Sequence, residues 1–373
     1  MTGKERVLSA LRHEQPDRVP FFEYAADYDI MQQILGREVF LRGHFKEAQA
    51  LWEGRRDELV EGYKRDLVDF TRATGADGLM VSMVPPSGFQ PEPLQQLDEE
   101  NWRDWAGNLY RYSPLTEDLG LIAVGALDPQ SPPPDLWEPP AEPDPSEFEL
   151  IDFAVRELGA THFLMSRRGR RLSIGYISGL YMEAHLLSFI ERPDQLREDR
   201  LAASEAARAE FEMLLSHGVE SVMLEEDFGC TSGPMMSPRT FRDVILPGLT
   251  RLCGNLKSFG APAFFHSCGV NWPLIDMFLE AGIDMYQAIQ PEEDIVGLKR
   301  DYGDRLGLWG GISTDGLVRW TPEQMKAEVT RVVEACKPNG GFILGASHSV
   351  TVRARADNYL AAIAALNEHG WRT

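Results

Sequence analysis

The chain has 373 residues, 43% of them hydrophobic, and a formal net charge of −21 at pH 7. Its longest basic run, residues 167–171, is too short for the Lys and Arg cluster that a nucleic-acid groove needs, and we expect it to be a solvated strand flank. An anionic membrane surface is excluded as a partner for the same reason. No apolar stretch reaches the roughly 18 residues that span a bilayer. The start lacks the apolar core of a signal peptide, so we expect a cytoplasmic protein with reduced cysteines.

The N-terminal part of the chain predicts helices, strands and one long excursion. The spacing of apolar residues predicts helices over Lys4–His13 and Glu47–Thr74, strands over Val19–Tyr24 and Gly78–Val84, and a small β excursion over Asn108–Tyr112. Residues 131–148 are rich in Pro, Asp and Glu. We interpret them as an exposed insertion and not as a domain linker, because the alternation of strands and helices resumes after them.

The second half alternates more regularly. Predicted strands are Arg171–Ile177, Ser221–Leu224, Pro262–Phe265, Met285–Ile289, Leu306–Trp309 and Gly341–Leu344. Predicted helices between them are Glu205–His217, Phe241–Gly260, Pro273–Ala281 and Pro322–Cys336. This alternation indicates βαβ units and a parallel sheet. About eight strands, without a dinucleotide-binding glycine motif after the first, favour one α/β domain over residues 1–373: a single (β/α)8 TIM barrel with N-terminal helical additions.

Polar residues gather where the predicted strands end, which is where (β/α)8 barrels carry their chemistry. The most informative pair is His266-x-Cys268, because a two-residue spacing can direct an imidazole and a thiolate at one ion. Both are favoured zinc ligands, and three protein ligands with an open position make a catalytic zinc site. The third ligand stays open among Cys230, Glu292 and His348. A hydrogen-bonded histidine beside a buried thiol is the alternative interpretation.

Three consecutive carboxylates follow the fourth strand. Crowded carboxylates raise one another's pKa and suit general acid or base chemistry, so Glu226 and Asp227 are candidate catalytic residues. Capping of the next helix or pairing with a basic side chain explains the run equally well. If Glu226 lies at the rim, Glu226→Gln should impair function more than stability.

The chain resembles the uroporphyrinogen decarboxylase-like superfamily along nearly its whole length. The motifs that carry the resemblance are residues 6–20, Glu226-Asp227-Phe228, residues 233–238, Phe265-His266-Ser267-Cys268-Gly269, residues 308–312 and residues 340–343. The resemblance implies a (β/α)8 barrel. The arginine motif with which true decarboxylases bind porphyrinogen carboxylates is absent, and Ser82 and Met83 stand where the decarboxylase aspartate is expected.

Two branches of the superfamily lead to different functions. In the decarboxylase branch, His348 matches a C-terminal histidine, and either Tyr181 or His185 is the counterpart of the tyrosine. In the zinc-dependent, corrinoid-linked methyltransferases, His266 and Cys268 match the motif at the fifth strand. That branch also carries a cysteine after the last strand, where this chain has His348. The resemblance therefore implies a zinc site with a changed set of ligands, or none.

The leading hypothesis is a zinc-assisted methyltransferase that moves a methyl group between a small methylated substrate and a separate corrinoid protein. The substrate would be a methoxylated compound, a methylamine or a thiol, and the acidic net charge favours a neutral or cationic donor. The alternatives are a carboxy-lyase, with His348 as general acid, and a non-catalytic barrel that binds a small molecule.

Overall fold

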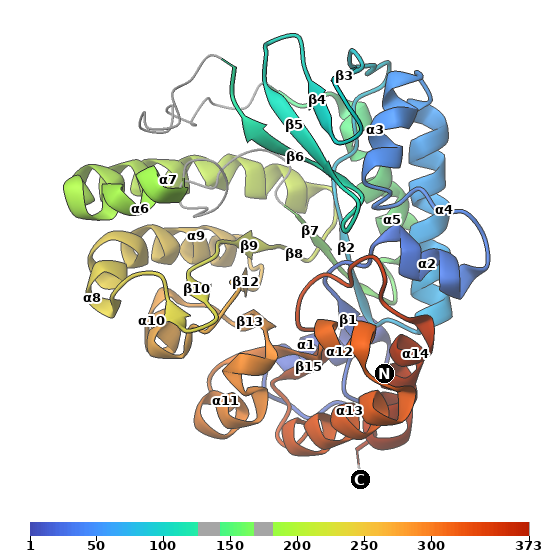
Figure 1. The fold of residues 1–373 in the computed structure, drawn as a ribbon. Helices are drawn as coiled ribbons and strands as arrows, with labels where there is room; N and C mark the ends of the chain where they lie inside the picture. The colour runs from blue at the N-terminus through green and yellow to red at the C-terminus, as the bar shows by residue number, and fades with distance from the viewer. Residues whose placement is uncertain (126–141, 168–181, 373) are drawn as a thin grey trace.

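A computed structural model describes residues 1–125, 142–167 and 182–372 of the chain. Its α/β architecture places parallel strands inside and helices outside (Figure 1). One parallel sheet has the order β1-β2-β7-β8 and consists of Phe22–Glu23, Gly78–Val81, Phe163–Ser166 and Ser221–Val222. The other has the order β15-β14-β13-β12-β9 and consists of Phe342–Ala346, Gly307–Ile312, Met285–Ile289, Phe264–His266 and Leu224–Glu225.

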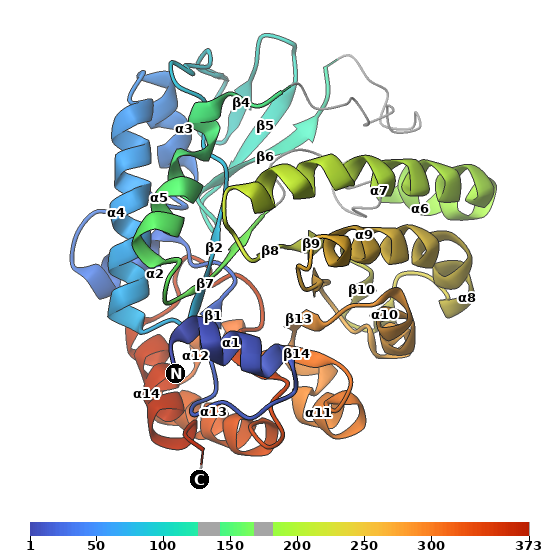
Figure 2. The same ribbon diagram turned by 180° about the vertical axis from the view of Figure 1, so that it is seen from behind.

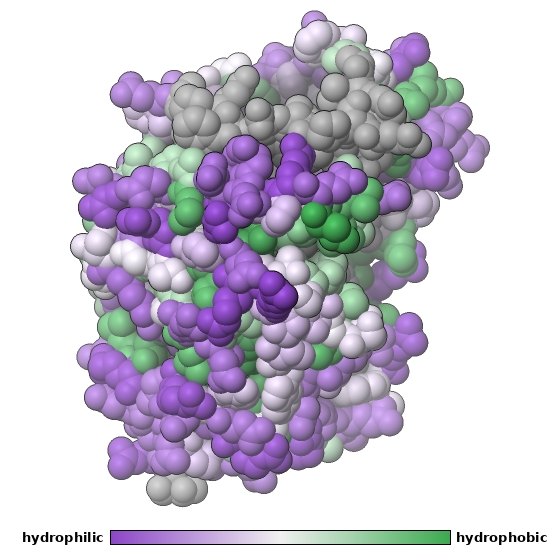
Figure 3. All heavy atoms as spheres, turned by 90° about the vertical axis from the view of Figure 1, so that its left-hand side faces the viewer, coloured by the Kyte–Doolittle hydropathy of each residue, from purple (hydrophilic) through white to green (hydrophobic). Residues whose placement is uncertain are grey.

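The helices pack around these two sheets. Those of the N-terminal part are α1 (Gly3–Leu11), α2 (Tyr28–Leu35), α3 (Phe45–Trp52), α4 (Arg56–Thr74) and α5 (Glu149–Leu158). Those that follow are α6 (Met182–Glu191), α7 (Pro193–Ser216), α8 (Pro238–Thr240), α9 (Leu246–Ser258), α10 (Ile275–Ala281), α11 (Ile295–Tyr302), α12 (Thr314–Arg319), α13 (Pro322–Cys336) and α14 (Ala356–His369). Among the described residues, no helix has the length and apolar composition to cross a membrane. The face drawn in Figure 3 is mainly hydrophilic, in keeping with the charged composition.

Four aromatic rings fill the space that the two sheets enclose. Phe22, Phe163, Phe264 and Trp309 come from β1, β7, β12 and β14, and the Phe22 and Trp309 ring centroids lie 4.4 Å apart. A layer of side chains from alternate strands is typical of (β/α)8 barrels. Helix α1 covers the end at which the strands begin (Figure 2). Its Val7 and Ala10 side chains pack in the same buried cluster as the four rings. The opposite end, where the strands finish, is left for polar side chains.

Several elements differ from the sequence prediction. The predicted helix Glu47–Thr74 is two helices, since the chain turns at Gly54, which has a positive φ of 72°. The third strand is Phe163–Ser166, which we did not predict, and the predicted strand Arg171–Ile177 lies outside the described residues.

The long excursion between β2 and α5 confirms the predicted β segment and differs from expectation at the end of the predicted exposed segment. Asn108–Tyr112 falls in a four-stranded antiparallel sheet beside α3 (Figure 1), formed by β3 (Gln95–Gln96), β4 (Asn101–Arg103), β5 (Leu109–Ser113) and β6 (Asp118–Ala123). Of the predicted exposed segment 131–148, the last four residues form a 3-10 helix with Glu147 and Phe148 buried. The ring of Phe148, which precedes α5, belongs to the hydrophobic core. Residues 131–141 lie outside the described part.

Candidate metal centre

The candidate site lies where the strands of the second sheet end. His266 is the last residue of β12, Cys268 follows it by two residues, and His348 follows β15 by two residues. Parallel strands present their carboxyl ends on one side, so residues more than 80 positions apart in sequence meet there. A potential ligand atom from each of the three residues lies within 4.8 Å of the other two.

The three residues offer the donor atoms that zinc prefers. The Nε2 atom of His266 lies 3.3 Å from the Cys268 sulfur, and the two imidazole centroids lie 5.3 Å apart. Two histidines and one cysteine form a protein set that leaves a fourth tetrahedral position for a substrate or water. Among the described residues, these three side chains have ligand atoms close enough together to hold a metal ion. The residues present therefore fit zinc.

His266 is held in the orientation that a metal ligand needs. Its Nδ1 atom contacts the Oε1 atom of Gln287, which can only accept, so the proton sits on Nδ1 and the Nε2 lone pair is free. The ring stacks on Tyr24 with centroids 4.6 Å apart and planes 15° from parallel. Burial lowers the pKa of His266, which keeps the imidazole neutral.

His348 is held differently. Its Nδ1 atom accepts the backbone N–H of Ser349 at 2.7 Å, so in the neutral ring the proton sits on Nε2. Burial first, and then the positive charges of Arg167 and Arg42, lower the pKa of His348 to about 4. A neutral His348 suits a metal ligand but not a general acid at neutral pH. A ligand bond from this ring competes with the Ser349 contact, so His348 is the least firmly oriented of the three.

A buried network fixes the loop that carries Cys268. The Nδ2 atom of Asn271 donates to the carbonyl oxygens of Ser267, Cys268 and Gly269 at 3.0–3.3 Å. The backbone N–H of Asn271 donates to Glu293 at 2.6 Å. Burial first, and then the nearby Asp227, raise the pKa of the Cys268 thiol well above its usual value. A thiolate at this position therefore needs a cation beside it.

The three carboxylates after the fourth strand do not share one environment. The Oδ1 atom of Asp227 accepts the backbone N–H of Cys268 at 2.9 Å and lies 3.8 Å from the His266 Nε2 atom. Glu225 accepts the hydroxyl of Tyr24. Successive side chains of a strand point to opposite faces, so Glu226 points away from the cluster. It lies 2.5 Å from Arg200 of α7, and both are at most 3% exposed. Glu226 is therefore a buried ion-pair partner and not a rim residue.

The other predicted site residues do not join the cluster in the described structure. Cys230 is exposed in β10 (Gly229–Cys230), and its sulfur contacts the carbonyl oxygen of Gly233 at 3.1 Å. Glu292 is exposed in a 3-10 turn after β13. Tyr181 lies outside the described residues.

Sequence reasoning missed two residues beside the cluster. Tyr24 contacts both imidazole rings, with its centroid 6.2 Å from that of His348, although we predicted it only as the end of a strand. Arg167 was expected to be solvated. Instead its guanidinium carbon lies 4.3 Å from the Tyr24 ring centroid. Only the position of Arg167 directly after β7 could have pointed to the site, and β7 itself was not predicted.

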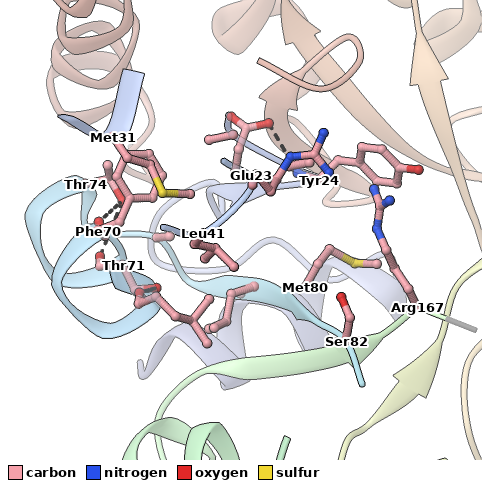
Figure 4. Close-up of a pocket in the computed structure, with 17 residues that line it drawn as sticks. Glu23, Tyr24, Met31, Leu41, Phe70, Thr71, Thr74, Met80, Ser82 and Arg167 are labelled. Atoms are coloured by element: carbon pink, nitrogen blue, oxygen red, sulfur yellow. Dashed lines mark hydrogen bonds between the residues drawn. The ribbon is translucent and has the colours of Figure 1, made fainter. Parts of the chain in front are cut away.

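A cavity of about 130 Å³ adjoins the cluster through Tyr24. Figure 4 shows Met31, Leu41 and Phe70 on one side of it and Tyr24 with Arg167 on the other. Ser82 and Arg42 also line this cavity. Its wall is mainly apolar, and its polar groups are the two arginines, the carboxyl of Glu23 and the hydroxyls of Thr71, Thr74 and Ser82.

Fold and site together define an α/β protein whose polar centre lies at the carboxyl ends of parallel strands. The family model described as uroporphyrinogen decarboxylase (URO-D) matches residues 183–369, and the chain belongs to this family. A methyltransferase from Methanosarcina mazei has a similar solved structure, with a TM-score of 0.70, 17% identity and 99% of each chain covered. At this identity the likeness concerns the fold.

A second solved structure is described as a putative dihydrodipicolinate synthetase from Pseudomonas aeruginosa. It covers 61% of this chain and 62% of its own, with 10% identity and a TM-score of 0.31, which is too low to support an argument. No curated protein sequence matches the chain.

Proposed function

We propose that this protein is a zinc-assisted methyltransferase that moves a methyl group between a small methylated substrate and a corrinoid protein. The observation that carries the proposal is the convergence of His266, Cys268 and His348 within 4.8 Å. The family membership and the fold likeness to a methyltransferase support it. His266 and Cys268 are the first two ligands, and His348 stands where the resembled methyltransferases carry a cysteine.

The proposal treats the two parallel sheets as one closed (β/α)8 barrel. Segment 221–225 belongs to both sheets, through β8 and β9, and a parallel bridge pairs Phe21 with Leu344 between β1 and β15. A Cβ added to Gly345 would collide with the carbonyl oxygen of Phe22, so the two edge strands approach closely. These contacts support closure, which would draw the three ligands from one ring of strand ends.

Each residue of the site has a defined part in the proposed reaction. Zinc, when bound, stabilises negative charge on the heteroatom that loses or gains the methyl group. Gln287 and Asp227 orient the ligands, the first through the His266 ring and the second through the Cys268 backbone. Asn271 holds the Cys268 loop in place through hydrogen bonds to its carbonyl groups. Tyr24 covers one face of His266 and limits the access of water to it.

The decarboxylase alternative has less support. It requires a protonated group to deliver a proton to carbon, and the pKa of His348 at about 4 leaves its ring neutral at pH 7. The buried pair of Glu226 with Arg200 removes another candidate acid from the cluster.

The test is a paired assay on one preparation. Methylation of reduced cobalamin by methoxylated aromatics, methylamines and methylated thiols is measured beside the release of labelled carbon dioxide from uroporphyrinogen. We expect methylation with at least one donor class, and its loss in Cys268→Ser. Enzymatic release of carbon dioxide would overturn the proposal, and the absence of activity in both assays would favour a binding protein.

A further inference from the structure

We infer that the substrate of this site carries a carboxylate group, which Arg167 binds at the mouth of the cavity beside the metal cluster. The inference deepens the proposed function, and it revises our expectation of a neutral or cationic donor. It rests on the contacts of Arg167, on the second arginine that lines the cavity, and on the size and lining of the cavity itself.

Arg167 is placed at the site with unused hydrogen-bonding capacity. Its backbone N–H donates to Val81 at 3.0 Å, which fixes the start of the side chain at the end of β7. Its Nε atom forms an ion pair with Glu225 at 3.7 Å, which is too long for a hydrogen bond. Its Nη2 atom is buried and has no hydrogen-bond partner in the part of the chain that the structure describes. A buried donor without an acceptor is unfavourable, so an incoming acceptor is stabilised there.

The direction of the guanidinium points to the cavity and the cluster together. Figure 4 shows Arg167 rising toward the ring of Tyr24, with Met80 and Ser82 beside it. The same tyrosine contacts both imidazoles of the cluster. A group bound to Arg167 therefore lies within one small molecule's length of the metal ligands.

A second arginine adds positive charge at this mouth. Arg42 lines the same cavity and donates to Asp27 at 2.8 Å. Glu225 and Asp227 bring negative charge to the same side, but the Tyr24 hydroxyl and the Cys268 backbone N–H already bind them. Arg42 is paired with Asp27, so the Nη2 atom of Arg167, which has no hydrogen-bond partner in the described part of the chain, is the donor that an incoming anion can meet.

The size and lining of the cavity indicate the size and polarity of the rest of the substrate. Its volume of about 130 Å³ approaches the roughly 150 Å³ of an engineered cavity that binds benzene. Apolar side chains such as Met31, Leu41 and Phe70 form much of its wall. A planar guanidinium binds a carboxylate through two parallel hydrogen bonds. The substrate class is accordingly a methylated derivative of a small aromatic or short-chain carboxylic acid.

The experiment measures binding, so that it does not depend on methyl transfer. Benzoate and its neutral counterpart benzyl alcohol are titrated into the full chain by calorimetry, in wild type, Arg167→Gln and Arg300→Gln. Arg300 is the control because its side chain is exposed and pairs with Asp301. We expect benzoate to bind about 10–100-fold tighter than benzyl alcohol in wild type and in the control, since hydrogen bonds to charged groups contribute about 1.5–3 kcal/mol.

The Arg167→Gln variant should lose most of this preference and keep its affinity for benzyl alcohol, which also shows that the variant is folded. The same titration on Cys268→Ser separates a carboxylate held by Arg167, which still binds, from one held by a metal, which does not. Equal affinities in wild type, no binding of either probe, or an unchanged preference in Arg167→Gln would each overturn the inference. A carboxylate preference without any methyl transfer would leave this inference intact and refute the proposed function.

Discussion

The two halves of this molecule contribute different things to one site. From residue 183 onward the chain matches the family model, forms the five-stranded sheet, and supplies His266, Cys268 and His348. The part before it carries the inserted antiparallel sheet and supplies Tyr24, Arg42 and Arg167 around the cavity. The C-terminal half therefore provides the three residues that could hold an ion, and the N-terminal half provides the lining of the adjoining cavity.

The largest effect should come from the C-terminal half. Cys268→Ser and His266→Ala each remove a ligand that its neighbours hold in place, so we expect metal content to fall from about one zinc per chain to nearly none. His348→Asn should lose less, because the Ser349 amide competes for that ring. Elemental analysis of protein purified without chelator or affinity-tag metal measures this. Cys230→Ser is the control and should keep the metal, since Cys230 is exposed in β10. A zinc-free wild type would contradict the metal centre.

Substitution of Glu226 tests whether this carboxylate stabilises the fold or takes part in the metal centre. We expect Glu226→Gln to lower the free energy of unfolding by about 3–5 kcal/mol, because it removes the buried counter-charge of Arg200. Zinc content of the folded fraction should not change. The exposed pair of Glu205 with Arg251 provides the control, and Glu205→Gln should cost less than about 1 kcal/mol. This result would reverse our sequence-based expectation, and equal melting of both variants would refute the structural role.

Glu23 tests the contact between the two halves. Its carboxyl accepts from Ala346 and Tyr359, and burial raises its pKa to about 8. The folded state then binds the proton more tightly than the unfolded state, whose pKa is 4.5. This contribution to stability is fully present below pH 4.5 and is lost as the pH rises toward 8, by up to about 1.4 kcal/mol per pH unit. Denaturant titrations between pH 5 and 8 should show the slope, and Glu23→Gln should flatten it. An unchanged slope in that variant would assign the effect to other groups.

The smallest expected effect concerns the loop that carries Cys268. Asn271→Ala removes the donor that three carbonyl groups of this loop share, so we expect zinc affinity to fall about 10–100-fold without loss of the ligands. Competition with a chromophoric chelator measures the change. Asn358→Ala is a matched control, because its amide also donates to three buried carbonyls, but next to α12. Equal zinc affinity in the two variants would show that Asn271 only stabilises the fold.

Local patterns predicted the parallel α/β architecture and the His266-x-Cys268 pair. The second half alternated regularly because its strands are short, apolar and separated by amphipathic helices, so each element could be recognised by itself. Phe163–Ser166 escaped notice because four residues next to a basic run give little periodicity, although the strand is fully buried. The break at Gly54 was also missed, since helical spacing continues on both sides of it.

The sequence by itself determined that a histidine and a cysteine lie two residues apart at the end of one strand, because this spacing belongs to the chain and does not depend on packing. It left the third ligand open among Cys230, Glu292 and His348, and it could not show that Glu226 faces a helix. The order of strand ends predicted His266 and His348 on one face, but only the tertiary structure decided that their ligand atoms lie within 4.8 Å and that Arg167 lies over Tyr24. The physical reason is that strand order, register and the alternation of side chains across a sheet bring distant residues together. Those features depend on the packing of the whole chain and leave no local pattern at the residues that meet.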